Sequence, residues 1–320
     1  MMMKKSLTAP ACVKEMNRRA TCALAAALWC LLSAATAAAQ DGVEKKTVTL
    51  TLGETAVKVN VYEKAGARVT FFAPHHDELG APEAAKEAIA KHGGRLVELV
   101  SFDDAGRPAR RVAFKLRGKS YSVDPNRIFT ENGRTCAGLS ADVEPAVQSF
   151  AEALLEIIYA PGGKRLREGE SFLVAVHNNT DFESKVGRAR ADDLTADAFA
   201  RPGPADAAAH SAFQDSAAGV FLSNREADAD NFALVTDARL LGPFAERGFN
   251  VVLQRPPAEL RGTGCNVDDG SLSIYSALQN VPYVNLEADA LSGGARQREM
   301  LEAVYALLQL KLANGGDGRP

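Results

Sequence analysis

The feature that most constrains the fold is an alternation of short apolar runs with longer helical segments through most of the chain. Runs rich in Val, Ile and Phe, bounded by Gly, Pro or charged residues, are typical of strands. Apolar residues spaced three or four apart are typical of helices. Strands and helices that alternate in this way predict an α/β fold with a mixed, largely parallel central sheet and helices on both faces. Neither an internal repeat nor an obvious linker divides the chain, so we expect a single domain over 40–320.

The expected elements follow one another closely. A hairpin is predicted over 46–62, with Gly53-Glu54 at its turn. The predicted strands are 69–73, 96–100, 111–116, 172–176, 232–236, 250–254 and 283–286. The predicted helices are 82–91, 143–159, 239–247, 271–279 and 295–312. We interpret 123–129 as a loop and the Ala- and Asp-rich stretch 181–230 as an elaborated loop region.

The first 39 residues have the pattern of a secretory signal peptide. Basic residues precede an apolar run at 22–35, and small residues follow, ending with Ala37-Ala38-Ala39. A basic leader, a short apolar stretch and an A-x-A site mark an exported protein. The apolar run is shorter than the ~20 residues that a membrane helix needs, so an uncleaved anchor is the weaker alternative. We expect a secreted or periplasmic protein with no transmembrane segment after cleavage.

The net charge bears on the kind of partner, and the cysteine content bears on whether the protein contains a disulfide. The formal net charge of −3 lacks the basic excess of a nucleic-acid-binding protein, so we expect no nucleic-acid partner. Cys136 and Cys265 are the two cysteines that follow the leader, and an oxidising compartment permits them to form a disulfide. The alternatives are two free thiols or two soft metal ligands.

Polar side chains follow several of the predicted strands. His75 and Glu78 come after the first buried strand, His177 after a later one, and Glu287 after the last. The carboxyl ends of parallel strands are where α/β sheets gather their chemistry. Two His and one carboxylate, with a fourth position left to water, form the catalytic type of zinc site. The sequence therefore predicts that His75, Glu78 and His177 bind one metal ion.

The ordered set of motifs resembles the zinc carboxypeptidase superfamily, including its succinylglutamate desuccinylase and aspartoacylase branch. The set comprises, in chain order, H-x-x-E at His75 and Glu78, D-x-N-R at Asp124, Asn126 and Arg127, then His177, and finally Glu287. Four ordered motifs spread along the chain are far more specific than any one of them.

This resemblance implies a role for each residue. His75, Glu78 and His177 would hold one Zn²⁺, which lowers the pKa of bound water and polarises the scissile carbonyl. Glu287 would be the general base that takes a proton from water and passes it to the leaving nitrogen.

The same resemblance implies how substrate and ligands are held. Asn126 and Arg127 would bind a substrate carboxylate, because a guanidinium presents parallel donors that match it. Arg127 is thereby counted with Glu287 among the catalytic residues. Asp124 would hydrogen-bond the far nitrogen of His75 and fix its tautomer.

Several neighbours offer alternatives. His76 competes with His75 as a ligand, although His75 alone has the i, i+3 relation to Glu78, and Asp77 lies beside the metal or faces solvent. Asp289 is an alternative to Glu287. Arg127 alternatively pairs with Asp124. We interpret His92 and His210 as surface residues.

The resemblance also leaves some positions open. The arginine that many of these enzymes aim at the carbonyl oxygen has four candidates: Arg107, Arg110, Arg111 and Arg117. The tyrosine that closes over the substrate has two, Tyr275 and Tyr283. The run 268–271 either caps the next helix or contacts a cationic substrate, and we favour the cap. The amides after His177, from Asn178 on, either bind substrate or tie down their loop.

The expected function is a secreted zinc-dependent hydrolase that cleaves an amide bond near a free carboxylate. Peptides, including the stem peptides of peptidoglycan, are the expected substrates of a carboxypeptidase or amidase of this kind. One alternative is a deacylase of N-acyl amino acids of the desuccinylase type. The other is a catalytically inactive periplasmic binding protein on the same fold.

Overall fold

The computed structural model describes residues 42–159, 166, 172–179, 217–221, 223, 225, 231–260, 264–265, 268–290 and 294–314. The predicted leader, His210 and most of the predicted loop region 181–230 lie outside these residues. Among the described residues, no helix has the length and apolar character needed to cross a membrane.

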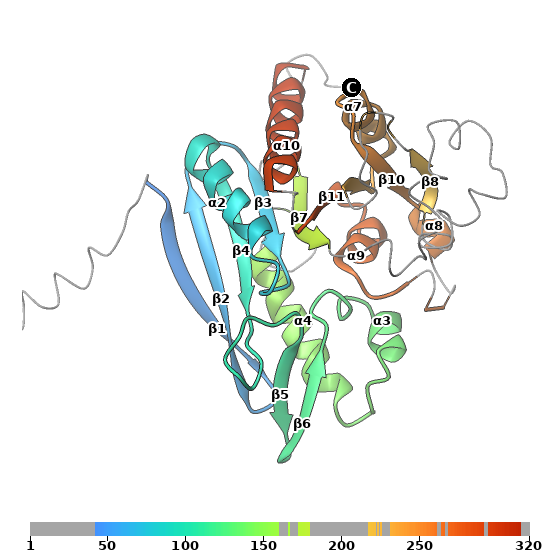
Figure 1. Ribbon diagram of the computed structural model, residues 1–320. Helices are drawn as coiled ribbons and strands as arrows, with labels where there is room; N and C mark the ends of the chain where they lie inside the picture. The colour runs from blue at the N-terminus through green and yellow to red at the C-terminus, as the bar shows by residue number, and fades with distance from the viewer. Residues whose placement is uncertain are drawn as a thin grey trace, which may run out of the picture. The chain divides into compact units, whose positions relative to one another are not determined.

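A large mixed sheet forms the centre of the described structure (Figure 1). In spatial order its nine described strands are β1 (Glu44–Leu52), β2 (Thr55–Lys64), β4 (Gly94–Val100), β3 (Val69–Ala73), β7 (Phe172–Asn179), β11 (Tyr283–Asp289), β9 (Phe232–Val235), β10 (Asn250–Gln254) and β8 (Ala217–Phe221). The four central strands, β4, β3, β7 and β11, run parallel. Strands β1, β2 and β8 pair antiparallel with their neighbours, as does β9 with β11. The predicted mixed sheet with a parallel centre is confirmed.

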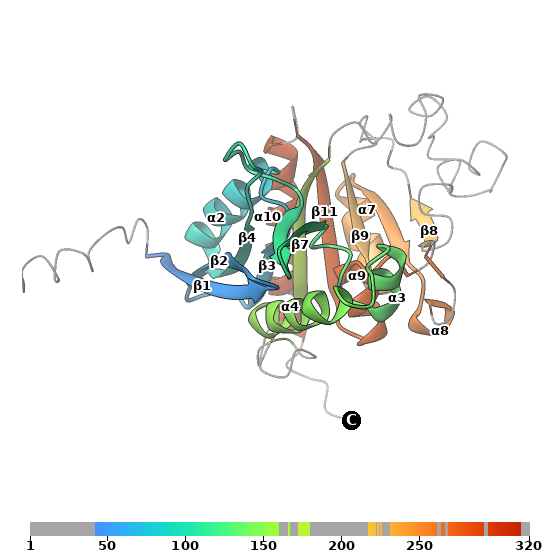
Figure 2. The ribbon, with the colours of Figure 1, turned by 90° about the horizontal axis from the view of Figure 1, so that it is seen from below.

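Helices cover both faces of this sheet (Figure 2). The helices α2 (Gly80–His92), α7 (Leu241–Glu246, after the short 3₁₀ helix η2, Ala238–Leu240) and α10 (Gly294–Asn314) share one core with the sheet. The helices α4 (Glu144–Ile158) and α9 (Leu272–Leu278) share the other. Successive residues of a strand point to opposite faces, so Val174 of β7 packs in the first core and Ala175 in the second. The predicted two-faced arrangement is confirmed.

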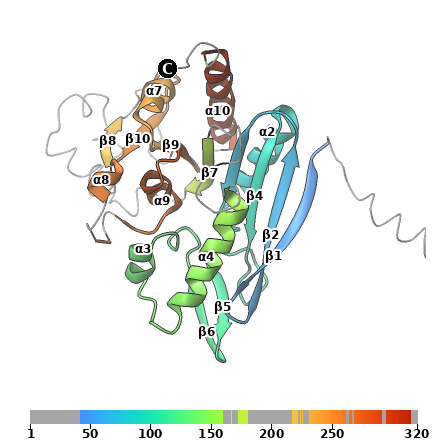
Figure 3. The ribbon, with the colours of Figure 1, turned by 180° about the vertical axis from the view of Figure 1, so that it is seen from behind.

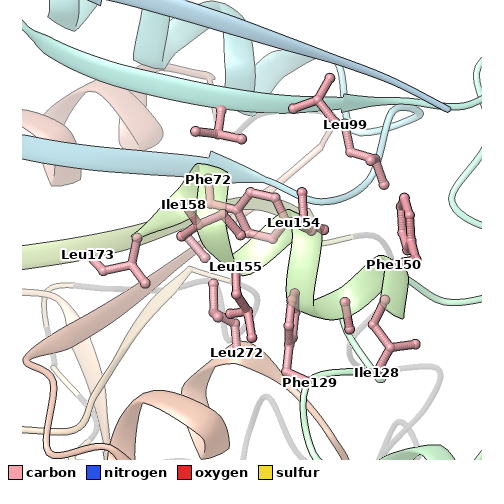
Figure 4. Close-up of a cluster of buried hydrophobic side chains, with 14 of the residues drawn as sticks. Phe72, Leu99, Ile128, Phe129, Phe150, Leu154, Leu155, Ile158, Leu173 and Leu272 are labelled. Carbon is pink, nitrogen blue, oxygen red and sulfur yellow. The ribbon is translucent and has the colours of Figure 1, made fainter. Parts of the chain in front are cut away.

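Helix α4 packs on the same face of the sheet as α9, and Figure 3 shows it in front of the sheet. Its apolar residues recur at helical spacing, and Phe150, Leu154 and Ile158 are fully buried. They lie in one cluster with Phe72 of β3 and Leu272 of α9 (Figure 4). Each such side chain contributes roughly 1.5–3 kcal/mol on burial. This packing holds β3 and α9 against α4.

The structure adds elements that the pattern did not predict. The expected strand 111–116 is β5 (Val112–Leu116), and it pairs with β6 (Lys119–Val123) in a separate two-stranded sheet. Strand β6 is mostly polar and exposed, and α3 (Glu131–Cys136), β8 and α8 (Pro257–Leu260) are short. None of them carries the apolar periodicity on which the prediction depends.

Strands β7 and β11 extend beyond their predicted ends. The predicted strands stop at Val176 and Leu286, but both continue for three more residues. His177 and Glu287 therefore lie inside the sheet as paired residues, not in loops after it. Apolar character marks the buried part of a strand, whereas backbone pairing continues through polar residues as well.

Candidate metal centre

Three buried residues, two from the turn after β3 and one from the neighbouring strand β7, meet at the carboxyl end of the central sheet. His75 and Glu78 lie in the tight turn between β3 and α2, and His177 lies in β7. Their exposed fractions are 1%, 7% and 2%. One ligand atom from each lies within 4.8 Å of the others, close enough for a single ion.

Glu78 is the centre of this cluster. Its Oε1 lies 2.7 Å from Nδ1 of His75, and its Oε2 lies 3.0 Å from Nδ1 of His177. The backbone N–H of Asn178 donates to Oε2 at 3.1 Å. The two imidazole rings lie side by side, with centroids 4.9 Å apart. The turn and the strand thus direct two nitrogens and a carboxylate toward one point.

His75 lies between two carboxylates, and a cation can take the place of one of its hydrogens. Its Nε2 lies 3.0 Å from Oδ1 of Asp124, while its Nδ1 faces Glu78. The protonated ring donates to both carboxylates, whereas the neutral imidazole has one N–H and donates to only one of them. If Nε2 of the neutral ring donates its hydrogen to Asp124, the lone pair on Nδ1 of His75 faces Oε1 of Glu78. A divalent cation bound by both of these atoms removes the repulsion between them.

The donor set also agrees with a metal. Two imidazoles and one carboxylate, with an outer carboxylate on one His, are the ligands of catalytic zinc sites, although other divalent ions accept them too. Nε2 of His177, the ring nitrogen that does not face Glu78, is buried and has no hydrogen-bond partner among the described residues. The residues present therefore fit a divalent ion, and the donors alone do not choose zinc.

The electrostatics keep the carboxylates ionised. Burial alone would raise the pKa of Glu78, but the His177 and His75 imidazoles outweigh burial and hold that pKa below its usual range. Burial is likewise outweighed at Asp124, where His75 and Arg127 lower the pKa. For His75, burial lowers the pKa, while Asp124 and Glu78 raise it more, so the net shift is upward. The carboxylate pKa values are lowered by the neighbouring imidazoles and guanidinium, and the His75 pKa is raised by the two carboxylates around the ring.

One of the four candidate arginines reaches the cluster. The Arg110 Nη1 donates to Oε1 of Glu78 at 2.7 Å, and its Nε lies 3.5 Å from Oδ2 of Asp124. Its side chain is 42% exposed, so it stands at the boundary between the buried ligands and solvent. By contrast, Arg107 pairs with Asp103, and Arg111 donates to the Ser122 carbonyl.

The D-x-N-R segment lies between β6 and α3. The Oδ1 of Asp124 accepts from the backbone N of Asn126 at 2.9 Å, so the same carboxylate orients both His75 and this loop. Oδ1 of Asn126 accepts from the backbone N of Leu272 at 3.1 Å, which joins the loop to the start of α9. The Arg127 side chain is 39% exposed, and its Nε lies 3.4 Å from Oδ2 of Asp269, so its closest carboxylate among the described ion pairs is Asp269.

Close packing holds this loop against the segment before α9. Thr130 donates to Asp268 at 2.6 Å, and the Phe129 N–H donates to the Gly270 carbonyl at 2.9 Å. A Cβ added at Gly133 would lie 2.0 Å from Cα of Gly270, so a larger residue at Gly133 would force these backbones apart. The loop that carries Arg127 is therefore fixed from both sides.

A disulfide and a helix cap complete that connection. Cys136 and Cys265 form a disulfide across 129 residues of sequence. Ser271 is the N-cap of α9 and accepts from the backbone N of Ile274, while Asp269 accepts from the backbone N of Ser271. The run 268–271 thus caps its helix, and Asp269 also faces Arg127.

Glu287 lies beside the cluster by strand register. It is paired with His177 across the parallel strands β11 and β7, and paired residues of neighbouring strands point to the same face. Its side chain is partly exposed, and Nδ2 of Asn285 donates to its Oε1 at 2.9 Å. Asp289 lies two residues further along, opposite Asn179.

The structure places the remaining candidates away from the ion position. His76 turns outward, with Nδ1 2.6 Å from the Ser101 carbonyl, and Asp77 is exposed. The His92 Nε2 lies 3.0 Å from the Glu302 carboxylate, on the helical face. The Asn178 side chain accepts from the Ala81 backbone N at 2.7 Å, so it ties down the start of α2.

One of the two candidate tyrosines is buried and the other is partly buried against aromatic rings. Tyr283 is buried in the core that contains α4. Tyr275 packs against the rings of Phe129 and Tyr159. Asn285, which contacts Glu287, was missed by the sequence analysis because a lone Asn inside a strand run carries no motif.

Comparisons with known proteins give fold likenesses of low similarity. No family model matches the sequence, and no curated protein matches it. Among solved structures, a candidate metallopeptidase from Shewanella baltica OS155 is 13% identical, with 82% of this chain and 86% of that chain covered at a TM-score of 0.36. A succinylglutamate desuccinylase from Silicibacter sp. TM1040 is 14% identical, with 86% and 69% covered at a TM-score of 0.38. The bottromycin maturation enzyme BotP in complex with Mn is 11% identical, with 84% and 63% covered at a TM-score of 0.38.

At identities and TM-scores this low, these likenesses carry no argument about function, and we base the function on the geometry of the site.

Proposed function

We propose that this protein is a metal-dependent hydrolase that cleaves an amide bond near a free carboxylate. The observation that carries the proposal is the convergence of His75, Glu78 and His177 with Glu287 in register beside them. Three protein ligands, from the turn after β3 and from β7, are the number that a catalytic metal site uses when its fourth position is left to water or substrate, and the Glu287 carboxylate lies on the next strand.

The reaction adds water across the scissile C–N bond. A divalent cation, with zinc as our choice, supplies the Lewis acid that polarises the carbonyl and makes water acidic. Glu287 takes the proton that water loses as oxygen attacks the carbonyl carbon, and returns it to the nitrogen as the C–N bond breaks. The products are a carboxylic acid and an amine.

Two arginines have the remaining roles, which are to stabilise the transition state and to bind the substrate carboxylate. Arg110 stands against Glu78 with two-fifths of its side chain exposed, where its guanidinium can stabilise the negative charge that develops on the carbonyl oxygen. Arg127, held between the Asn126 carbonyl and Asp269, presents a second partly exposed guanidinium for the substrate carboxylate. The packed loop beneath Arg127 keeps the distance between carboxylate and scissile bond constant.

We further propose that the enzyme is exported and acts on peptides such as peptidoglycan stem peptides. The signal-like leader supports export, and the Cys136–Cys265 disulfide suits an oxidising compartment. Short peptides that end in a free carboxylate match the Arg127 loop.

Paired substrates test the proposal. We expect a peptide with a free C-terminal carboxylate to be cleaved with a kcat/KM at least 100-fold higher than its C-terminal amide, because Arg127 loses its partner in the amide. The preference should collapse in Arg127→Met. Equal rates on both substrates would exclude the proposed binding of the substrate carboxylate by Arg127. An N-acyl amino acid series in the same assay separates peptidase from deacylase.

The role of Glu287 has its own test. Glu287→Gln should lower kcat by at least 1,000-fold, because the substitution removes the general base. The variant should still bind one divalent ion per chain, because Glu287 is not a metal ligand. Metal content after dialysis and turnover should be measured on the same sample. Near-normal turnover of Glu287→Gln would show that another group is the base.

A further inference from the structure

We propose that Asn285 is a positioning residue that orients the Glu287 carboxylate for proton transfer. The inference rests on the proposed function, since it assigns a support to the base named there. Nothing in the sequence motifs points to Asn285, and its role follows from its place in the sheet.

Asn285 and Glu287 lie two residues apart on β11, so both side chains stand on the face that carries His177. Nδ2 of Asn285 donates to Oε1 of Glu287 at 2.9 Å. A glutamate side chain has three rotatable bonds, and a partly exposed one samples several rotamers. A donor fixed in the sheet selects the rotamer in which Oε1 turns toward the amide, and this sets the direction of Oε2.

The surroundings of Asn285 keep that donor in place. Its register partners are Ala175 on β7 and Leu234 on β9, both buried and apolar. The Asn285 side chain is 9% exposed. It therefore stands in a close-packed part of the sheet, where its amide has little freedom to leave Glu287.

An unmet hydrogen bond shows that the fold alone does not account for an amide here. Oδ1 of Asn285 is buried and has no hydrogen-bond partner in the part of the chain that the structure describes. A buried acceptor left without a partner destabilises the folded state, and an apolar residue of similar size avoids this. Residues that lower the stability of a fold are expected at functional sites. We assign to Asn285 the function of holding the Glu287 carboxylate in one orientation.

The first test replaces the amide by an apolar side chain that suits a strand. Asn285→Val should lower kcat on the order of 10-fold and leave KM within about twofold, because substrate binding does not involve Asn285. Its melting temperature should equal or exceed that of the wild type, since the unmet acceptor is gone. A lower melting temperature with unchanged kcat would assign Asn285 a structural role and overturn the proposal.

A matched control exists in the same sheet. Asn60 of β2 donates to Oε2 of Glu98 at 2.9 Å, the same kind of bond at the same length, far along the sheet from β11. Asn60→Val should leave kcat unchanged. If it lowers kcat as much as Asn285→Val does, the effect is a general response of the sheet and the proposal fails.

A double-mutant cycle decides whether Asn285 acts through Glu287. The drop in kcat caused by Asn285→Val in the wild type should shrink to less than twofold when the residual turnover of Glu287→Gln is the background. A drop that persists there would overturn the proposal. Full activity of Glu287→Gln alone would instead refute the base assignment, so the two failures are distinguishable.

Discussion

Two buried glutamates in this sheet have the same exposure and different surroundings. Glu78 and Glu98 are each 7% exposed. Glu98, in β4, accepts from the Asn60 amide at 2.9 Å, the Tyr62 hydroxyl at 3.2 Å and the Lys86 ammonium at 3.0 Å. These partners are donors in every protonation state found near neutral pH. The Glu98 carboxylate is therefore satisfied by the protein itself.

Glu78 has partners of another kind. Two of them are imidazoles, each with one N–H when neutral, and one of these also faces Asp124. Arg110 and one backbone N–H supply the remaining donors. Burial of a carboxylate therefore does not by itself mark a function. Glu78 is set apart by the kind of its partners, since two of them are imidazoles, whose nitrogens bind a divalent cation when they are deprotonated.

The largest contrast should appear in metal binding. Glu78→Gln is expected to weaken divalent-cation affinity at least 100-fold, because the one charged ligand becomes neutral. Glu98→Gln should bind like the wild type. Titration calorimetry with Zn²⁺ and Mn²⁺ on metal-stripped protein measures both. Equal affinities of the two variants would contradict the metal centre.

The second contrast is stabilisation by the ion. A ligand at 100 times its dissociation constant stabilises the folded state by about 2.7 kcal/mol. Zinc or manganese at that excess should raise the melting temperature of the wild type and of Glu98→Gln by several degrees. Glu78→Gln should not respond. A shift of the same size in all three would mean that the ion binds elsewhere.

A smaller effect concerns the stability that Glu98 provides. Glu98→Gln should lower the free energy of unfolding at pH 7 by about 1–3 kcal/mol, because Lys86 loses its charged partner. Burial raises the pKa of Glu98, but Asn60 and Lys86 lower it more, so the net shift is downward.

The sign of its pH dependence follows from that shift. A lowered folded-state pKa stabilises the protein above the unfolded value of about 4.3, and this stability is lost as pH falls below it. The difference between wild type and Glu98→Gln should therefore shrink from pH 6 to pH 3 in urea unfolding. A difference that grows on acidification would contradict this account.

The smallest effect is expected beside the metal ligands. His76→Ala should change metal affinity and kcat by less than about twofold, because His76 turns toward the Ser101 carbonyl. His75→Ala should lose metal. If His76→Ala lost metal and His75→Ala did not, the ligand assignment would be reversed.

Much of the fold was predictable because strands and long helices carry their own periodicity. Strand β3 has the predicted limits, and α4 begins and ends within one residue of prediction. Short or polar elements such as β6 and α3 were missed because they gain order from packing on their neighbours. The ends of β7 and β11 were misplaced because backbone pairing does not require apolar side chains.

The sequence could single out His75, Glu78, His177 and Glu287 as candidates, because the type of side chain and the order of motifs are local information. It could not tell which of four arginines contacts Glu78, or that Asn285 contacts Glu287, because those contacts depend on which loops and strands meet. Strand register places Glu287 opposite His177. Tertiary packing also joins the Arg127 loop to α9. The chain alone thus determined which chemical groups are present, and only folding decided which of them touch, because hydrogen bonds and metal ligation act over a few ångströms in space.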